Sequence, residues 1–556
     1  MLFVFAFLAA MIVSMALLPL LIRFGRRFDF VDAPAPRKVH SVPIPRIGGL
    51  AIGLGVVSAV VVADAAVFSP AMLAIMLGGA IVLIAGLVDD KVELGYRSKF
   101  AAQILAAIIV VYIGDVSIRE VSLPQTVVFP DWLAKPLSVF IIVALTNAVA
   151  LSDGLDGLAG GIVFICCTAL ALLAWATGNV PSALLAVALA GAIFGFLRFN
   201  THPAIVFMGD SGSQFLGLLS AVLAIEVTQD ASAHISAALP LLLLAVPIID
   251  TAQVTISRLR RGVSPFSADK YHLHHRLLSI GFAHPHAVLI IYIAQSSFFL
   301  LAYFLRYQSD LLIAVAFVAT ASALLLPLLV AQRRAEQSPA TPVPDSGATL
   351  VRIDDRARRN IVAWVARGVV GILALYVLLL IVGIAKGGSM TPTADATASQ
   401  VQQLALILLA ALVASFVLLS KPAADLFAQG TGYVVAAMIA FSASGLVWSE
   451  PLFASLEFTL LIVLGLGNVA WLIFNSNRAL QLTTLDILLL FAALVVPNLP
   501  VLSADVQGLA TLVFRLVVLF YSVEVIAAAF PRGLVLRMAV TSSLLLIAVN
   551  TSMIAT

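Results

Sequence analysis

The sequence is short of charge. Only 11% of its 556 residues are Asp, Glu, Lys or Arg, 62% are hydrophobic, and the mean hydropathy is +1.11. A soluble domain is about a quarter charged and about half apolar. The composition therefore excludes a soluble globular protein and indicates an integral membrane protein. The net charge of +3 says little in such a chain, because the position of each charge matters more.

Cysteine is also scarce. The two cysteines, Cys166 and Cys167, are adjacent and lie in an apolar run, where neighbours in one helix are poorly placed to pair. We therefore expect no disulfide framework. The N-terminal apolar segment lacks a basic region ahead of it and a clear cleavage site, and three arginines follow it, Arg23, Arg26 and Arg27. We expect this segment to be the first membrane span, with the N-terminus outside, and not a signal peptide.

Long apolar runs are abundant. They are about twenty residues long, which suits helices that cross a hydrocarbon core of about 30 Å, whereas a transmembrane barrel would show shorter alternating segments. The predicted fold class is all-α, a polytopic integral membrane helix bundle. About eleven spans are expected in a first group, near 1–22, 47–68, 71–88, 100–113, 133–150, 160–177, 181–198, 212–227, 237–256, 286–305 and 310–331. About seven more are expected near 361–385, 403–420, 432–448, 452–474, 484–502, 508–530 and 533–552.

A polar stretch rich in proline and serine separates the two groups. We therefore predict a membrane domain over 1–331, a cytoplasmic linker over 332–360 and an accessory multi-span membrane domain over 361–556. With the N-terminus outside, most basic loops fall on the cytoplasmic side, as the positive-inside rule requires, although Lys386 does not. The loops rich in glycine and aspartate fall on the same side.

Paired acids, Asp89 and Asp90, end one of the apolar runs. The dipole at the C-terminal end of a helix disfavours negative charge, so we expect a positive partner, either Lys91 and Arg97 or a metal ion. The alternative is a solvated helix end.

Two further stretches combine aspartate with glycine. In "TNAVALSDGLDGLAGG", residues 146–161, Asp153 and Asp156 are neighbours if the segment is helical, Asn147 lies about two turns earlier, and the glycines allow close approach of a ligand. In "FMGDSGSQFLG", residues 207–217, Asp210 opens the next apolar run and suits a metal carboxylate or a phosphate site at a helix N-terminus. A glycine-rich turn and an ordinary N-cap are the alternatives.

Two stretches are basic. "SPFSADKYHLHHR" contains His272, His274 and His275, whose spacing is not a usual zinc pattern, so contacts to phosphate fit better and binding of anionic lipid is the alternative. "RKVHSVPIPR" contains Lys38 and Arg46 and is by itself a positive-inside loop. Because Mg²⁺ is typically held by one or two carboxylates plus substrate phosphates, carboxylates and bases on one membrane face indicate phosphoryl transfer.

The stretches "DD", "NAVALSDGLDGLAGG", "FMGDSGS" and "HLHH", in this order, resemble those of the polyprenyl-phosphate N-acetylhexosamine-1-phosphate transferases over residues 1–331. The resemblance implies transfer of a sugar-1-phosphate from a UDP-sugar to a polyprenyl phosphate, usually undecaprenyl phosphate, with release of UMP, at the start of cell-envelope polysaccharide synthesis. It implies a multi-pass protein of the bacterial inner (plasma) membrane whose active site faces the cytoplasm. The implied cofactor is Mg²⁺, with Mn²⁺ as the alternative. The implied partners are the UDP-N-acetylhexosamine, the polyprenyl phosphate and the lipid bilayer, without nucleic acid, and a homodimer stays open.

The resemblance also implies roles for single residues. Asp89 would be the base that deprotonates or orients the lipid phosphate, Asp90 would support it, and Asp210 would be the main Mg²⁺ ligand. The implied metal set is Asp210, Asp90 and Asp153. Phe207 could stack on uracil, and the three histidines would contact the diphosphate or the sugar. The implied substrate contacts are Lys38, Arg46, Asn147, Asp153, Asp156, Phe207, His272, His274 and His275. Direct attack and a covalent route through Asp89 are both compatible with the sequence.

Leu273 interrupts the histidines, whereas the muramoyl-pentapeptide branch usually has three in a row, so the resemblance favours UDP-GlcNAc or a related sugar. Residues 361–556 depart from the family pattern, and "GLVWSEPLFASLEF" faintly resembles a stretch of O-antigen polymerases and ligases. Two alternatives therefore stay open: a transporter or flippase of a lipid-linked glycan, and a bifunctional transferase with a polymerase-like C-terminal module. Arg515 and Glu524 share one expected span but not one face, so each is expected to have another partner.

Overall fold

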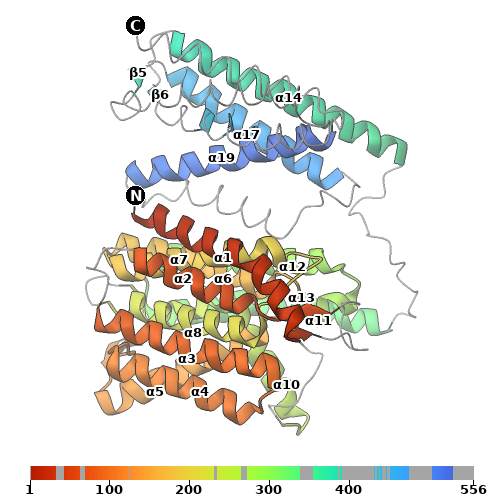
Figure 1. Cartoon of the computed structure of the whole chain (residues 1–556). Helices are drawn as coiled ribbons and strands as arrows, with labels where there is room; N and C mark the ends of the chain where they lie inside the picture. Colours follow the sequence, from red (N-terminus) through yellow and green to blue (C-terminus); the bar gives the residue numbers. More distant parts are fainter. Residues whose placement is uncertain are drawn as a thin grey trace. The chain divides into compact units, whose positions relative to one another are not determined.

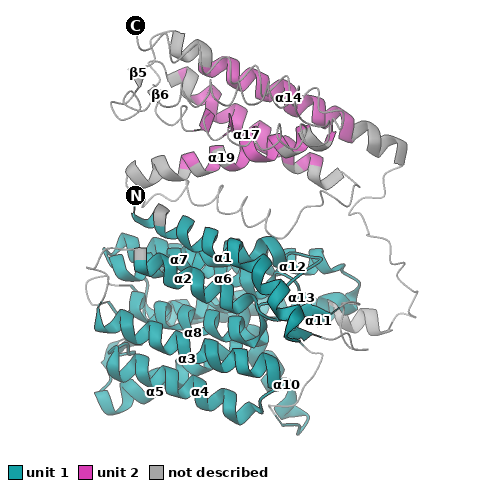
Figure 2. Ribbon diagram, viewed as in Figure 1, with its two compact units in different colours: residues 1–348, 483–488 teal, residues 349–482, 489–556 magenta. Residues whose placement is uncertain are grey.

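The computed structural model covers the whole chain and is drawn in Figure 1. It describes residues 2–32, 43–62, 69–123, 125–230, 235–264, 272–337, 355–385, 389–390, 431, 435–436, 439–440, 446–447, 451–474 and 504–529. The described residues form two compact units (Figure 2), one up to residue 337 and one from residue 355 onward. Each unit is described by itself.

The first unit is a bundle of helices, and each expected span of this part coincides with helical structure. Its helices are α1 (Leu2–Arg27), α2 (Gly48–Val62), α3 (Pro70–Val92), α4 (Tyr96–Ile108), α5 (Asp131–Leu151), α6 (Leu158–Ala176), α7 (Val180–Asn200), α8 (Gly209–Thr228), α9 (Pro240–Leu243), α10 (Ala245–Arg260), α11 (Leu273–Ile280), α12 (His284–Leu305) and α13 (Asp310–Gln337). A π-helical turn, Ile109–Ile113, continues α4. Two small antiparallel pairs, β1 (Val31–Asp32) with β2 (Ile44–Pro45) and β3 (Glu120–Leu123) with β4 (Gln125–Val128), complete the unit.

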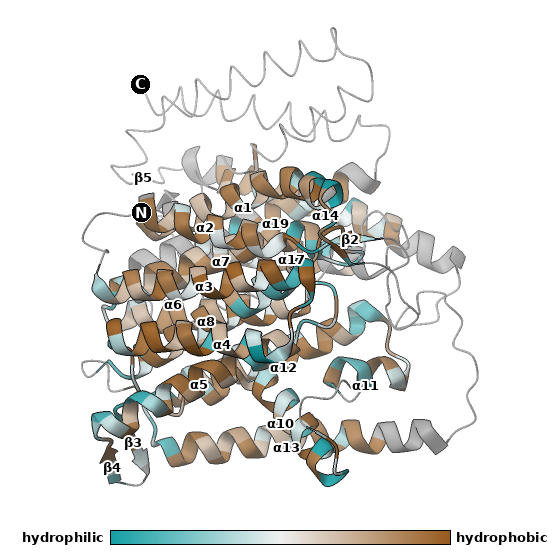
Figure 3. Cartoon of the chain, turned by 60° about the horizontal axis from the view of Figure 1, so that its bottom comes forward, coloured by the Kyte–Doolittle hydropathy of each residue, from teal (hydrophilic) through white to brown (hydrophobic). Residues whose placement is uncertain are grey.

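The predicted fold class is confirmed, because ten helices among the described residues are long and apolar enough to cross a membrane. Figure 3 shows that the helices of the first unit are hydrophobic along most of their length and hydrophilic mainly near their ends and in loops. Such helices satisfy their own backbone hydrogen bonds in lipid, where water cannot.

The expected span over 237–256 is not one continuous helix, which corrects the sequence analysis. It breaks at Leu244 into α9 and α10. Pro247 explains the break, because a proline ring clashes with the carbonyl four residues earlier and has no N–H to donate. Gln295 of α12 binds both sides of the break: its amide nitrogen donates to the Leu243 carbonyl at 2.8 Å, and its oxygen accepts from the Val246 N–H at 3.2 Å.

Helix α8 lies at the centre of the first unit and is buried along almost its whole length. It packs against α2, α3, α5 and α6 (Figure 1). Two glycines allow the closest approaches to its first turn. A Cβ on Gly49 of α2 would lie 2.2 Å from the Gly212 nitrogen, and a Cβ on Gly86 of α3 would lie 2.3 Å from the Ser211 Cα. The backbones of α2 and α3 therefore fix the position of the start of α8.

The second unit contains α14 (Asp355–Ala385), α17 (Pro451–Phe474) and α19 (Ala504–Ala529), with a strand pair of β5 (Ser389–Met390) and β6 (Leu446–Val447). Its core includes Tyr376, Leu464, Trp471 and Val525. Arg515 pairs with Glu457 of α17, with its Nη2 2.8 Å from Oε1. This confirms that Arg515 has a partner other than Glu524.

Helices coincide with three of the seven spans expected in this part, 361–385, 452–474 and 508–530. The spans expected at 403–420, 484–502 and 533–552 lie outside the described residues. The span expected at 432–448 lies mostly outside them; its described residues 435–436 and 439–440 are helical, and β6 occupies two residues near its end.

We predict that Gly49→Ala destabilises the first unit, because the added methyl group would collide with backbone atoms of α8 that cannot rotate away. Overpacking of this kind costs about 1–3 kcal/mol, and the thermal unfolding midpoint in detergent should fall accordingly. Gly95→Ala is the matched control, since a Cβ there meets nothing within 4 Å. Equal midpoints for the two variants would contradict the close contact between α2 and α8.

Candidate active site

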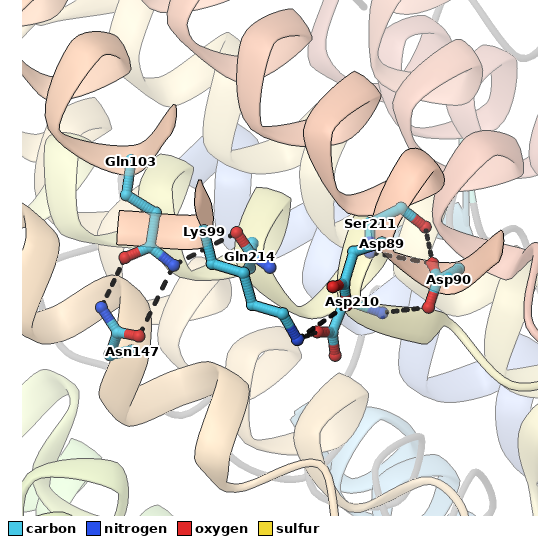
Figure 4. A network of polar contacts seen from close by, with 8 residues as sticks. All are labelled: Asp89, Asp90, Lys99, Gln103, Asn147, Asp210, Ser211 and Gln214. Atoms are coloured by element: carbon cyan, nitrogen blue, oxygen red, sulfur yellow. Dashed lines mark hydrogen bonds and ion pairs between the residues drawn. The ribbon is translucent and has the colours of Figure 1, made fainter. Parts of the chain in front are cut away.

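Polar side chains gather where α3 ends, α4 begins, α5 ends and α8 begins (Figure 4). The eight residues drawn there come from four helices that are separate in the sequence, and they form a network of hydrogen bonds and ion pairs. The network lies at one end of the bundle and not at its middle.

Asp90 is joined to the first turn of α8 by three hydrogen bonds. Its Oδ1 accepts from the Asp210 N–H at 2.8 Å, and its Oδ2 accepts from the N–H and the hydroxyl of Ser211 at 3.1 and 2.9 Å. The first N–H groups of a helix have no partner within the helix, and an anion there is favoured by the helix dipole. Asp90 thus caps α8 from another helix and fixes the direction of Asp210. Its predicted role as a metal ligand stays a prediction.

Lys99 contacts both Asp89 and Asp210, whose side chains lie next to each other (Figure 4). The Lys99 ammonium pairs with Asp210 and lies 2.7 Å from Asp89 Oδ2. Asp89 Oδ1 is buried and has no hydrogen-bond partner within the part of the chain that the structure describes. The Asp210 side chain is 40% exposed, so solvent and a ligand can reach it. The group therefore has an open side at Asp210 and an unused oxygen at Asp89.

The expected compensation of Asp89 and Asp90 by Lys91 and Arg97 is wrong. Lys91 instead donates to the backbone carbonyls of Phe28 and Asp29, and Arg97 donates to the Tyr96 hydroxyl at 3.3 Å. Lys99 takes the role because it lies on the first turn of α4, on the side of α4 that faces Asp89 and Asp210.

Asn147 lies beside this group and belongs to a set of three amide side chains. Its Nδ2 donates to Gln103 Oε1 at 2.5 Å and to the Val143 carbonyl at 2.8 Å. Gln103 in turn donates to Gln214 of α8 at 3.1 Å. These contacts hold α4, α5 and α8 together next to the carboxylates, and the predicted role of Asn147 in substrate binding stays a prediction.

The segment that carries Asp153 and Asp156 is a turn between α5 and α6, so the two side chains are not helical neighbours. Part of Asp153 reaches solvent, but protein surrounds its carboxyl group. This desolvation and repulsion by Asp210, Asp90 and Asp156 raise its pKa to about 7, against the opposing effect of Arg46. The shift shows that negative charge is concentrated here and would be relieved by a bound cation.

Asp156 contacts two histidines and the backbone of Ala204. Its Oδ2 lies 2.7 Å from His202 Nδ1 and accepts from the Ala204 N–H at 3.1 Å, while its own N–H donates to His284 Nε2 at 3.1 Å. Burial alone would raise the pKa of Asp156, but the hydrogen bond from His202 and the influence of His284 and Ala204 outweigh it and hold the pKa below its ordinary value.

The ligand atoms that Asp156, His202 and His284 could offer to a metal lie within 4.8 Å of one another. A carboxylate with two imidazoles suits transition metals better than Mg²⁺, which prefers oxygen. The Asp156 carboxylate oxygen and the His284 nitrogen that face each other already have protein partners. We therefore interpret the three residues as a structural contact that joins the turn before α6, the loop before α8 and the start of α12.

Arg46 and Phe207 lie side by side on two short extended segments. The Phe207 N–H donates to the Pro45 carbonyl at 2.8 Å, and the Gly48 N–H donates to the Phe207 carbonyl at 2.9 Å. Arg46 pairs with Asp32 and acts on the charge of Asp153. Arg46 thus acts on a residue of the site, the backbone of Phe207 lies beside Arg46, and Lys38 lies outside the described residues.

The histidines begin the short helix α11, whose position the loop 152–157 determines in part. A Cβ on Gly154 would lie 2.1 Å from His274 Nε2, so the ring packs directly on this glycine. The rings of His274 and His275 are 4.3 Å apart. Burial, and then the neighbouring His275, lowers the pKa of His274 to about 3, so His274 is neutral at physiological pH.

The structure therefore brings most of the predicted residues to one end of the bundle. It also adds residues to which the sequence analysis gave no role: Lys99, Gln103, His202, Ser211, Gln214, Asp250 and His284. Lys99 directly precedes the expected span 100–113 and Gln103 lies one helical turn later, within it, so their spacing indicates one helix face. His202 and Asp250 gave no such signal, because their partners are distant in the sequence.

Comparison with known proteins gives a consistent result. Residues 72–228 match the family model described as glycosyl transferase family 4. The chain is 38% identical over 292 residues to the "Probable undecaprenyl-phosphate N-acetylglucosaminyl 1-phosphate transferase" of Bacillus subtilis (strain 168), a match that covers 52% of this chain and 81% of that protein. It is 38% identical over 342 residues to the "Decaprenyl-phosphate N-acetylglucosaminephosphotransferase" of Mycolicibacterium smegmatis, which covers 54% and 83% of the two chains.

A more distant relative is the "Undecaprenyl-phosphate alpha-N-acetylglucosaminyl 1-phosphate transferase" of Escherichia coli (strain K12), 28% identical over 285 residues, or 49% of this chain and 76% of that protein. These matches cover most of each relative but only about half of this chain. The matched family segment runs from α3 to the end of α8 and includes the carboxylates and Lys99. The chain belongs to glycosyl transferase family 4.

Proposed function

We propose that this protein transfers N-acetylglucosamine-1-phosphate from UDP-N-acetylglucosamine to a polyprenyl phosphate, releases UMP and so starts the synthesis of a cell-envelope polysaccharide. The names of its relatives support a polyprenyl-phosphate acceptor and an N-acetylglucosamine-phosphate donor. The observation that carries the proposal is the group of Asp89, Lys99 and Asp210 at the end of the membrane helices, where a headgroup in lipid and a nucleotide in water can meet. The undecaprenyl chain and the cytoplasmic direction of this end are part of the proposal.

Mg²⁺ fits the residues present. The Asp210 side chain is partly exposed, and the pKa of Asp153 is raised by burial and then by repulsion from Asp210, Asp90 and Asp156. Oxygen ligands are those that Mg²⁺ prefers. Asp210 and Asp153 would hold it, whereas both oxygens of the expected ligand Asp90 are engaged in the cap of α8. When bound, Mg²⁺ would neutralise charge on the phosphates during transfer.

The reaction needs two anions to meet. A phosphate oxygen of the lipid attacks the phosphorus that carries the sugar, a new P–O bond forms, and the bond from that phosphorus to the oxygen of UMP breaks. Asp89 Oδ1 can accept the proton of a monoprotonated lipid phosphate, because it has no other partner in the described part of the chain. Lys99 holds Asp89 and Asp210 in place and supplies positive charge beside the reacting phosphates.

The nucleotide would lie on the other side of Asp210. Phe207 and Asp153 flank this side, and Arg46 adds positive charge near Asp153. His274 is neutral and packed on Gly154, so it can donate or accept a hydrogen bond to the diphosphate or the sugar but adds no charge. A transporter or flippase is not favoured, because the acids lie at helix ends and the relatives are named as transferases.

We predict that Asp210→Asn lowers UMP release by at least about a hundredfold, because it removes the exposed anion of the site while keeping its size. The measurement is UMP release by purified protein with polyprenyl phosphate, Mg²⁺ and a panel of UDP-sugars. Asp115→Asn is the matched control, an exposed aspartate that pairs with Arg119 at the other end of α4. Turnover by Asp210→Asn at the rate of the control would refute the assignment.

Removal of Mg²⁺ by a chelator should affect the same carboxylate site. We predict that EDTA abolishes UMP release and that added Mg²⁺ restores it, because phosphates and carboxylates otherwise repel one another. Restoration by Mn²⁺ would also agree with an oxygen-rich site, whereas full activity in EDTA would exclude an exchangeable divalent cation.

The relatives match only about half of this chain, and residues up to 337 form a compact unit. We therefore predict that a protein truncated after residue 337 keeps UMP release within about threefold of the full chain, as expected when the removed part adds no interaction in the transition state. Loss of activity in a truncated protein with an unchanged thermal midpoint would show that the second unit takes part in the reaction.

A further inference from the structure

Asp250 of α10 is a nearly fully buried carboxylate, with 3% of its surface exposed, and nothing above gives it a role. Burying such a group is costly unless it is hydrogen-bonded. Its Oδ2 lies 2.8 Å from His272 Nδ1, and its Oδ1 accepts from the Leu273 N–H at 2.6 Å and from Gln253 Nε2 at 3.0 Å. Two of these three partners begin the histidine segment, and they are 22 and 23 residues away from Asp250.

The bond to Leu273 holds the start of α11. Leu273 is the first residue of that helix, and its N–H has no partner within the helix. A carboxylate at this place satisfies the N–H and interacts favourably with the helix dipole. His272, the preceding residue, makes no side-chain cap of its own. Asp250 on α10 therefore acts as the N-cap of α11, although it is distant from α11 in the sequence.

The bond to His272 determines which ring nitrogen carries the proton. The carboxylate accepts, so Nδ1 must carry hydrogen, and Nε2 is left to accept a hydrogen bond or to take a second proton. The same arrangement orients imidazoles that bind metals, where loss of the carboxylate costs 10–100-fold. Asp250 thus determines both the position and the tautomer of this ring.

The effect extends to the other histidines. The rings of His272 and His274 are stacked, with centroids 5.7 Å apart and an angle of 12° between their planes. His274 in turn packs on Gly154, next to Asp153. Helix α10 packs against α5 and α12, and this packing fixes the position of Asp250. A continuous set of contacts therefore runs from α10 through Asp250, His272 and His274 to the turn 152–157.

We propose that Asp250 is a positioning residue for the transfer reaction: by binding His272 and the start of α11 it holds the three histidines against the turn that carries Asp153, where they contact the diphosphate of the nucleotide sugar. This inference rests on the proposed function. The lipid phosphate lies on the Asp89 side of the site, so Asp250 acts on use of the nucleotide sugar and not on use of the lipid.

The test is Asp250→Asn. Asparagine has nearly the same size and can still accept from Leu273, but its amide group then faces His272 Nδ1 and forces the ring proton to Nε2. We expect kcat/KM for the nucleotide sugar to fall by at least about tenfold, while KM for polyprenyl phosphate stays within about twofold. Combination with His272→Gln should add little further loss, because the two residues act as one unit. An additive double variant would overturn the proposal.

Asp310→Asn is the matched control. Asp310 is also a buried aspartate, 2% exposed, and it accepts from backbone N–H groups of Ser122 and Ala238, next to the β3–β4 hairpin that follows the other end of α4. The kcat/KM of Asp310→Asn should match that of the wild type within about twofold, because Asp310 is a buried structural residue that, among the described residues, shares no contacts with the site. An equal loss in Asp310→Asn and Asp250→Asn would mean that any buried aspartate is needed for folding, and would overturn the positioning role.

Asp250→Glu keeps the test valid if Asp250→Asn folds poorly. Glutamate retains the charge but is larger, so a positioning role through charge predicts that Glu supports more turnover than Asn. A packing role predicts the reverse order, which would overturn the proposal.

If the wild type releases no UMP with any UDP-N-acetylhexosamine, the proposed function fails, and this inference with it. If the wild type is active and Asp250→Asn is unchanged, only this inference fails.

Discussion

The structure of the site depends on one interaction, the capping of α8 by Asp90. Three hydrogen bonds join this carboxylate to the first turn of α8, and they fix the residue that follows Gly209, which is Asp210. Gly209 has a φ of +71°, and a Cβ on it would lie 2.3 Å from Asp90 Oδ2, so another side chain would both strain the backbone and displace the cap. The adjacent acids therefore have different tasks: Asp90 builds the site, and Asp89 keeps an oxygen for chemistry.

Charge in this part of the protein is tolerated because it lies at helix ends and is balanced. Ionisable groups within a membrane are costly and are usually paired or face water. Lys99 pairs with both Asp89 and Asp210, and Arg46 pairs with Asp32. The balance is incomplete near Asp153, because repulsion by Asp210, Asp90 and Asp156 adds to the effect of burial in raising its pKa. A site with surplus negative charge and open access at Asp210 is prepared for a cation and the phosphates that it carries.

Features that are local in the sequence could be predicted, and features that join distant residues could not. Apolar runs gave the spans of the first unit, except where Pro247 breaks one of them. The order and composition of the motifs indicated Asp89, Asp90, Asn147 and Asp210 as candidate site residues. Lys91 and Arg97 were expected to compensate the acids because they are close in the sequence, but they contact other groups, and Lys99 pairs with Asp89 and Asp210. The contacts of Asp156 with His202 and of Asp250 with His272 need the packed bundle, so no periodicity indicates them.

A buried carboxylate in the second unit shows by contrast what makes the first site reactive. Glu457 receives two contacts from Arg515, at 2.8 and 3.0 Å, and one from the Tyr376 hydroxyl at 3.3 Å. Removing one member of such a pair leaves an uncompensated charge and costs about 3–5 kcal/mol, so the pair maintains the packing of α14, α17 and α19. Asp89 differs because one of its oxygens is buried without a partner among the described residues. A carboxylate that binds an arginine and a tyrosine from two other helices holds those helices together, whereas one with an oxygen that has no partner can take a proton or a ligand.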